Sequence, residues 1–514
     1  MNPRRQAWSW LLGLALGWLV LEPGRAQEPA TGKLTPQELE TLRQMIREEV
    51  KAELAATPAP PASTPNPLLP EQGGLEASTD LGLHWRTADR SFALHLGGRF
   101  EWDTAWFTQS DGLLMGPAAG TRLEDGTAMR RARLRADGTV WQQIDYVFEV
   151  NFANIQDVAN VNNENVAVGS VGLANVFLNF RDVPLVGNVR LGHFSAPYGL
   201  DRFTGSTAFA YMERSSGVDA FWGPNFRQSG IMIFDAFYDQ RVTVHATFTR
   251  IGLANLNNLA FDAEDGRYAA GARLTALPLA TEDDRFLVHV GLNGFHQSLA
   301  GNGLAVANRL PLRAGAGPTQ VPNLLATGTF ASPDGATIAA VEAAMIAGPL
   351  ALSGEFTVAQ SGALFDEFDG LNYSGPRGRA TYHAYYVEAG LFITPGDRRR
   401  YNRQHAVWSR VIPQENFWTG GQGGAGCGRG RGAVELLARL NYLDLVSGQP
   451  VLTPTWPTAG VRAGRQRDVT LGLNWYLNPQ TRFMLNYVWA RVDSVEPGAS
   501  GDIHGLGVRV HFDF

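Results

Sequence analysis

Three arginines stand at alternate positions in the segment from residue 128 to residue 140. They are Arg131, Arg133 and Arg135, and the residues between them, Ala132 and Leu134, are apolar. Since successive side chains of a β-strand point to opposite faces, this spacing places three guanidinium groups in a row on one face. A guanidinium group donates paired hydrogen bonds to phosphate or carboxylate. The pattern therefore predicts a strand with an anion-binding face.

Charged residues of opposite sign occupy the polar faces of other predicted strands, and the sign differs between the two halves of the chain. The basic residues are Arg99, Arg131, Arg133, Arg135, Arg181, Arg190, Arg267 and Arg273, and the acidic residues are Glu342, Glu355, Glu388 and Glu435. If these strands enclose a common water-filled interior, a basic wall opposite an acidic wall would create a transverse field across it, and such a field acts on ions in transit. In an alternative interpretation, the arginines only pair with nearby carboxylates such as Asp137, Asp145 and Glu149.

The segments that carry these residues alternate between apolar and polar side chains, as half-buried strands do. The last one, 504–514, has Leu506, Val508, Val510, Phe512 and Phe514 on one face and Gly507, Arg509, His511 and Asp513 on the other. The pattern predicts sixteen strands, at 92–106, 128–140, 144–152, 173–181, 187–196, 228–236, 241–250, 267–277, 285–297, 335–347, 350–361, 380–393, 433–446, 467–477, 482–491 and 504–514. We therefore expect an all-β transmembrane β-barrel of about sixteen antiparallel strands.

The connections favour a membrane barrel because short turns alternate with long loops. Gly348-Pro349 and 478–481 are short turns, whereas 197–227, 298–334 and 447–466 are long loops. An even number of strands places both termini on the periplasmic, short-turn side. Segment 394–432 is too long for such a turn. It either folds as a plug-like segment or contains a missed hairpin, which would raise the strand count to eighteen.

The region before the barrel divides into three parts. Residues 1–26 have the features of a secretory signal peptide, with Arg4 and Arg5 ahead of a short apolar run. Residues 27–56 predict a periplasmic helix that starts at the capping box 35–38. Its apolar stripe either forms a short coiled coil between copies of the chain or lies against its own barrel. Residues 57–85 are a proline-rich linker, and residues 86–514 form the barrel.

Motifs and composition argue against an enzyme, a metalloprotein and a nucleic-acid-binding protein. The formal net charge of −6 provides no overall basic balance for nucleic acid. The glycine-rich run 421–426 matches a dinucleotide fingerprint by letter, but no helical pattern follows it. The histidines are scattered without metal-ligand spacing, so we expect no catalytic residues, no metal and no cofactor. A single cysteine, Cys427, excludes an intramolecular disulfide.

Several segments, in their order along the chain, resemble the phosphate-selective porins O and P of bacterial outer membranes, especially the envelope porins of this type predicted in planctomycetes. They are LHLGGRFEWDTAWF (94–107), MRRARLRADGTV (129–140), VRLGHFSAPYGLDRFTGS (189–206), AYMERS (210–215), GAVELLARLNYLDL (432–445), VTLGLNWYLNPQTRFMLNYVWARV (469–492) and the final FDF. The resemblance spans most of residues 90–514. It depends on the order and spacing of these segments, since no single one is strongly specific.

The resemblance implies a sixteen-stranded barrel surrounded by the outer-membrane lipid of a diderm bacterium, usually as a homotrimer. The outer-membrane barrel assembly machinery would insert it and would read the C-terminal aromatic residues Phe514 and Phe512. By resemblance to trimeric porins, loop 197–227 would fold inward and narrow the pore. The charged residues of this constriction loop are Arg202, Glu213, Arg214 and Asp219.

The sequence departs from the family pattern in its lysines. Family members commonly have a lysine where Ser195 stands, and no lysine follows Lys51 in this chain. The resemblance therefore implies a porin without deciding whether phosphate is preferred. Two functions follow. The chain forms a channel for passive diffusion of small, phosphate-like anions or other small polar solutes, or it is a structural envelope barrel that tethers the outer membrane to another layer and conducts little.

Overall fold

The structure is a computed structural model of the chain, and it describes residues 74–79, 81–114, 123–153, 158–161, 164–167, 171–222, 227–250, 268–298, 303–314, 321–368, 373–417, 430–447, 461–495 and 499–514. The predicted signal peptide (1–26), the predicted helix (27–56) and most of the predicted linker (57–85) lie outside the described residues, as do Arg267 and Cys427. Within the described part, no helix is both long enough and apolar enough to cross a membrane.

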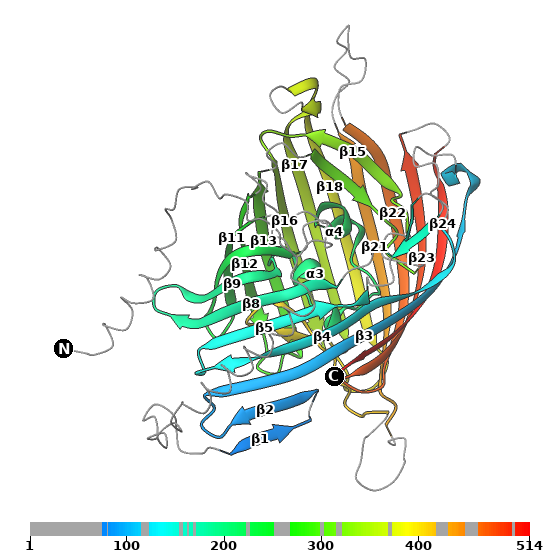
Figure 1. Cartoon of the computed structure of the whole chain (residues 1–514). Helices are drawn as coiled ribbons and strands as arrows, with labels where there is room; N and C mark the ends of the chain where they lie inside the picture. The colour runs from blue at the N-terminus through cyan, green and yellow to red at the C-terminus, as the bar shows by residue number, and fades with distance from the viewer. Residues whose placement is uncertain are drawn as a thin grey trace, which may run out of the picture. The chain divides into compact units, whose positions relative to one another are not determined.

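Most described strands belong to one sheet that closes on itself (Figure 1). The sheet contains 20 strands, and four of them, β1, β2, β14 and β15, pair outside the ring, which leaves sixteen in the wall. The wall strands are β3 (Phe92–Gln109), β4 (Gly126–Val140), β5 (Ile144–Asn151), β8 (Gly172–Val183), β9 (Gly187–Ser195), β10 (Arg227–Phe237), β11 (Val242–Arg250), β12 (Tyr268–Ala280), β13 (Phe286–Gln297), β16 (Ala336–Ala347), β17 (Leu350–Phe368), β18 (Tyr373–Phe392), β21 (Ala433–Ser447), β22 (Val461–Tyr476), β23 (Thr481–Ser494) and β24 (Gly501–Asp513).

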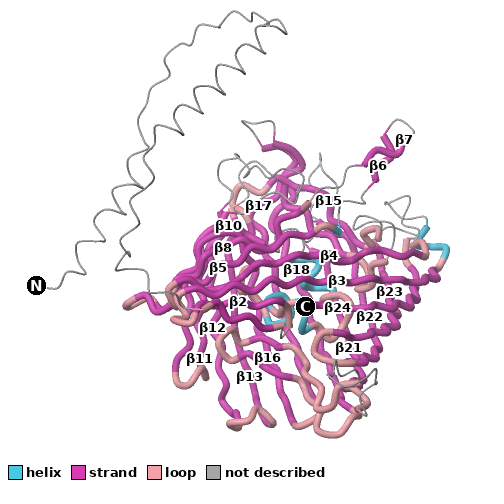
Figure 2. Tube along the Cα trace, turned by 60° about the horizontal axis from the view of Figure 1, so that its bottom comes forward, coloured by secondary structure: helices cyan, strands magenta, loops and turns pink. Residues whose placement is uncertain are grey.

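The ring closes between the first and last wall strands, β3 and β24, which lie side by side near the C-terminus in Figure 2. They pair antiparallel from Ile503 opposite Gln109 to Asp513 opposite Arg99. Beyond this ladder, the N–H of Gly98 donates to the carbonyl of Phe514 at 2.8 Å, and the N–H of Phe514 donates to the carbonyl of Gly98 at 3.1 Å. Closure pairs the two strands that would otherwise be exposed edges.

All sixteen predicted strands are present, so the predicted barrel is confirmed. The alternative count of eighteen is wrong. Segment 394–432 does contain two short strands, β19 (Arg400–Asn402) and β20 (Val407–Ser409), but they pair only with each other and not with the wall. This segment connects β18 to β21 at the end of the barrel that carries Gly348-Pro349 and 477–480, which we call the short-turn end. The opposite end is the long-loop end.

Alternation of side chains explains how the wall separates two environments. Along β24, Arg509 and His511 are buried on the inside, whereas Leu506 and Phe512 are about two-fifths exposed on the outside (41% and 40%). An outward apolar face suits lipid, and closure satisfies the backbone hydrogen bonds that lipid cannot. At the short turn between β16 and β17, Gly348 has φ 58°, a left-handed conformation that glycine adopts without strain.

A hairpin that the sequence did not predict extends the wall at the short-turn end. It consists of β1 (Leu75–Ser78) and β2 (Leu83–Thr87), and both begin inside the predicted linker 57–85. β2 pairs with β3 through Ala93–Leu96, the part of β3 that continues past the end of β24 (Figure 1). Two further hairpins, β6 (Val158–Val161) with β7 (Glu164–Ala167) and β14 (Gly303–Asn308) with β15 (Leu325–Ala331), belong to long connections.

Candidate functional site in the barrel interior

The connection between β9 and β10 folds into the barrel. We call its described residues 196–222 the inner loop. It contains α3 (Leu200–Phe203), the 3-10 turn η4 (Ser206–Ala208) and α4 (Ser216–Trp222), and Figure 1 shows α3 and α4 within the ring of strands. Its apolar side chains Tyr198, Met212 and Trp222 are 0–2% exposed and pack against inward-facing residues of the wall. The predicted inward fold of 197–227 is therefore seen in the described part of this loop.

Arginines of the wall hold the inner loop by its backbone. Arg439 donates to the carbonyl of Glu213 at 3.1 Å, and Arg482 donates to the carbonyls of Phe209 and Ser206 at 2.6 and 2.9 Å. A buried loop must find partners for its backbone carbonyls, because water does not reach them. Guanidinium groups, with five donors each, supply these partners.

The carboxylate of Glu213 fixes the middle of the inner loop to the wall. Arg130 donates to both of its oxygens at 2.6 and 2.9 Å, and Arg509 donates at 3.1 Å. Burial alone would raise the pKa of Glu213, but the charges of Arg130, Arg313 and Arg509 outweigh it and hold the pKa well below its usual range. Glu213 is therefore ionised and acts as a fixed negative charge inside the barrel.

A second segment enters the barrel from the short-turn end. We call residues 394–417 the inner segment. Arg399 donates to Glu435 of the wall at 2.8 Å and to the carbonyl of Ala208 in the inner loop at 2.8 Å. Arg273 of the wall donates to the carbonyls of His405 and Ala406 at 3.1 and 2.8 Å. The inner segment is thus tied both to the wall and to the inner loop, as expected of a plug.

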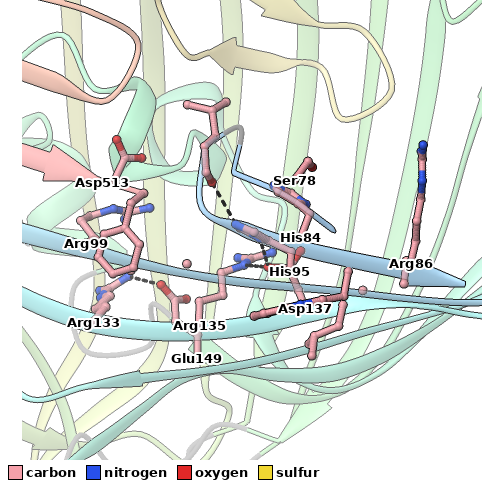
Figure 3. A pocket seen from close by; sticks show the side chains of 18 of the residues that line it. Ser78, His84, Arg86, His95, Arg99, Arg133, Arg135, Asp137, Glu149 and Asp513 are labelled. Atoms are coloured by element: carbon pink, nitrogen blue, oxygen red, sulfur yellow. Dashed lines mark hydrogen bonds and ion pairs between the residues drawn. The ribbon is translucent and has the colours of Figure 1, made fainter. Parts of the chain in front are cut away.

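A cavity of about 910 Å³ opens between the short-turn end of the wall and the β1–β2 hairpin. Figure 3 shows Arg99 and Arg133 on the same side of it. Its charged lining residues are Arg86, Arg99, Arg133, Arg135, Arg410, Glu76, Asp137, Glu149 and Asp513. The charge of Arg227 acts electrostatically on Arg133. The charges of Arg99, Arg133, Arg135 and Arg227 all act on the carboxylate of Glu149. We call Arg99, Arg133, Arg135 and Arg227 the arginine cluster.

A profile of the family described as "Phosphate-selective porin O and P" matches residues 95–514, which is nearly the entire barrel. This chain belongs to that family. Porin O of Pseudomonas aeruginosa is 22% identical over 440 residues, which cover 83% of this chain and 89% of the relative. An uncharacterized protein of Caulobacter vibrioides is 26% identical over 478 residues, which cover 89% of this chain and 82% of the relative. The molecule is an outer-membrane porin.

Solved outer-membrane proteins are similar to this porin at low identity. OmpT of Vibrio cholerae has a TM-score of 0.44 and 11% identity, covering 82% of this chain and 98% of that one. The outer membrane channel DcaP of Acinetobacter baumannii has a TM-score of 0.44 and 11% identity, covering 84% and 99%. An anion-selective porin from Comamonas acidovorans has a TM-score of 0.43 and 12% identity, covering 82% and 100%.

Most of the arginines that the sequence placed in the porin lumen form ion pairs. The pairs are Arg131 with Glu101, Arg133 with Glu149 at 3.2 Å, Arg135 with Asp137 at 2.7 Å, Arg181 with Asp145 at 2.5 Å and Arg273 with Glu342 at 2.6 Å. Arg99 donates to the hydroxyl of Ser206, and Arg190 stacks 4.2 Å from the ring centre of Phe177. The pairing interpretation therefore describes the geometry of five of these residues.

The four predicted acidic residues have partners of different kinds. Glu342 contacts Arg273 and His289, and Glu435 contacts Arg399. Glu355 accepts hydrogen bonds from the N–H of Asp201 and the hydroxyl of Tyr386, and Glu388 accepts one from Ser353. In the constriction loop, Arg214 donates to backbone carbonyls, Asp219 pairs with Arg313, and Arg202 stacks 5.2 Å from Trp222. The interior is thus a mixed network and not two walls of opposite sign.

Several interior residues of the porin were missed at the sequence level. Arg130 was missed because the pairing of β3 with β4 shifts between Glu101 and Trp102, and this bulge places neighbouring Arg130 and Arg131 on the same side. Arg399 and Arg410 were missed because they lie in the inner segment, where no alternation exists to assign a face. Arg227, by contrast, begins β10 and could have been found by extending the predicted strand one residue.

Proposed function

We propose that this porin conducts small anions by passive diffusion, and that the arginine cluster at the short-turn end selects them. The observation that carries this proposal is the local charge balance. Among the charged residues that line the cavity, Arg86 pairs with Glu76 and Arg410 pairs with Asp513. Arg99, Arg133 and Arg135 then stand against the two carboxylates of Asp137 and Glu149, so positive charge remains for a passing anion. Rings of arginine are a known basis of anion selection in pores.

The inner loop and the inner segment would set the width of the path. Both occupy the lumen and contact each other through Arg399 and the carbonyl of Ala208. A solute would pass beside them and enter the 910 Å³ cavity, which Arg99, Arg133 and Arg135 of the cluster line. Guanidinium suits phosphate and carboxylate equally, so phosphate and small organic anions are the expected class of solute. A homotrimer inserted by the barrel assembly machinery, with its N-terminal helix in the periplasm, completes the proposal.

Reversal potentials in planar bilayers test the selectivity. In a gradient of potassium chloride, the unchanged porin should be anion-selective, with openings in groups of three if it is a trimer. The double variant Arg99→Gln, Arg133→Gln should shift the reversal potential toward cations, because it removes two charges from the cluster. Arg285→Gln is the matched control, since Arg285 is exposed, pairs with Asp283 and does not line the cavity. Equal reversal potentials for the double variant and the unchanged porin would refute the role of the cluster.

A structural envelope barrel is the second candidate. The observation that favours it is the filling of the lumen. Arg273, Arg439 and Arg509, which face inward, are at most 1% exposed. A barrel sealed by its loops would conduct little while it still anchors the N-terminal region. Absence of openings from folded, heat-modifiable protein would support this candidate and overturn the channel.

A further inference from the structure

Four neighbouring wall strands contribute a row of inward-facing side chains below the inner loop. Phe234 of β10 pairs directly with His245 of β11, and His245 pairs directly with Arg273 of β12. On the other side, Arg190 of β9 lies across Phe234, with its guanidinium carbon 5.2 Å from the ring centre. The row therefore places one aromatic ring between Arg190 on one side and the neighbours His245 and Arg273 on the other.

Residues of the inner loop and the inner segment pack against this row. The ring of His405, from the inner segment, lies 5.3 Å from Phe234 and 6.3 Å from His245. Phe203 of α3 meets both imidazoles edge-on, at 5.5 Å from His245 and 6.0 Å from His405. Wall, loop and inner segment thus meet around the two histidines.

Several buried nitrogens of this cluster lack partners within the described residues. Both ring nitrogens of His245, Nδ1 of His405 and Nε of Arg190 make no hydrogen bond there. His245 is 0% exposed. Buried polar atoms without partners are rare in native proteins and call for an explanation such as a bound ion or water.

The surrounding charge favours an anion. The groups whose charge acts on the imidazole of His245 are Arg273, His405 and Arg190, and none of them is a carboxylate. Burial and the positive charges of Arg190 and Arg273 lower the pKa of His405 to about 3. Arg273 is already paired with Glu342, and Asp145, which acts on Arg190, is paired with Arg181. No described group of three metal-ligating side chains exists that would suit a cation.

We propose that Arg190, His245 and His405 bind one small inorganic anion. Each neutral imidazole can donate one N–H, and the edge of the stacked Arg190 guanidinium supplies the charge. Because His405 belongs to the inner segment and the other two residues to the wall, the anion fastens the inner segment inside the barrel. This site is separate from the arginine cluster and does not require that the porin conduct.

Bromide is a direct probe, because its anomalous scattering locates it in crystals of the full-length protein. Crystals soaked in sodium bromide should show an anomalous peak among Arg190, His245 and His405. A peak that appears only in the 910 Å³ cavity, or no peak at all, would overturn the proposal. In that case water alone satisfies the two histidines.

Variants test the same site in solution through inorganic phosphate. A ligand that binds only the folded state raises the unfolding temperature, and the rise grows with the concentration of free ligand. Sodium phosphate should raise that temperature for the detergent-solubilised protein and for Arg133→Gln, which alters the arginine cluster only. The rise should be clearly smaller in Arg190→Gln and in His405→Gln than in the unchanged protein, because the arginine cluster is the same in all three. His405→Gln leaves every wall strand unchanged, so its smaller shift cannot be ascribed to a misfolded barrel.

The pattern of losses separates this inference from the proposed function. A phosphate-dependent shift that is as large in Arg190→Gln and His405→Gln as in the unchanged protein would refute the anion site, and its reduction in Arg133→Gln alone would assign the effect to the arginine cluster. A smaller shift in the first two variants with unchanged reversal potentials would establish the anion site apart from conduction.

Discussion

At the scale of single residues, the arginines inside this barrel have two roles, one in holding the fold together and one in lining a cavity. Arg439 and Arg482 bind backbone carbonyls of the inner loop, so they serve the fold. Arg99 and Arg133 line a cavity and share Glu149 with other arginines, so they are suited to passing anions. The residue type is the same in both cases. What differs is whether the donors are already occupied by the protein.

Arg509 offers the sharpest stability prediction. It donates to both oxygens of Asp103 at 2.6 and 2.7 Å and also contacts Glu101 and Glu213. Arg509→Met should lower the free energy of unfolding by about 3–5 kcal/mol, because it leaves Asp103 buried without its ion-pair partner. Denaturant titration of lipid-reconstituted protein measures this loss.

The controls for Arg509 are an exposed pair and a double variant. Arg467→Met removes a pair with Asp493 whose arginine is 60% exposed, and it should cost about 0–1 kcal/mol. Adding Asp103→Asn to Arg509→Met should restore part of the loss, because the unpaired charge disappears. Equal losses of unfolding free energy in Arg509→Met and Arg467→Met would show that the buried ion pairs of Arg509 stabilise the barrel no more than an exposed pair does.

Sequence alternation predicted the inward face of Arg133, Arg135 and Arg509 because strand geometry is local. It could not predict the partners of Glu213, which lie on β4 and on β24 at opposite ends of the barrel sequence. It also missed Arg130, since a bulge breaks the period of two that the prediction requires. The sequence therefore predicts which face of a strand a residue occupies, but it does not predict contacts between segments that are distant in the chain.

At the scale of elements, the inner segment is a connection much longer than is required to join two neighbouring strands of the wall. The other short-turn connections, such as Gly348-Pro349, join their strands in a few residues. Residues 394–417 instead enter the lumen, where the hydroxyl of Tyr401 lies 2.7 Å from Nδ1 of His289. The length of the segment showed that something unusual occurs there, but only the structure distinguishes a plug from a hairpin. Its path is set by contacts with β12, β13 and β21, which no local pattern encodes.

Shortening the inner segment should enlarge the pore. Replacing residues 398–412 by a short Gly-Ser linker removes β19, β20 and their contacts with the inner loop while leaving all sixteen wall strands. We expect a larger single-channel conductance in planar bilayers, because the lumen loses material that fills it. Shortening the β6–β7 hairpin, which forms a sheet of its own, is the matched control and should leave conductance unchanged. Equal conductance in both variants would place the ion path away from the inner segment.

At the scale of the whole molecule, the barrel depends on a closure that spans the chain. β3 begins the wall and β24 ends it, so no closed ring exists until the last strand is made. Alternation in the sequence located the sixteen wall strands, but a count of eighteen stayed open until the structure showed that β19 and β20 pair only with each other. Alternation did not locate the hairpin β1–β2, since its two strands of 4 and 5 residues are too short for periodicity to separate them from a linker.

Phe514 stands where this closure is completed. Its N–H and carbonyl exchange hydrogen bonds with Gly98, and its ring stacks 5.9 Å from that of Phe512 on the outer face. Deleting Phe514 should reduce the amount of folded protein in the outer membrane, because the last rung of the ladder and the predicted assembly signal are lost together. Heat-modifiable migration of membrane extracts on gels measures the folded fraction.

Phe514→Tyr should retain both features and assemble normally. Phe483→Ala, which removes another outward aromatic away from the terminus, should have a smaller effect. If the deletion and Phe483→Ala assemble equally well, closure tolerates the loss of its last residue, and the signal lies elsewhere in β24.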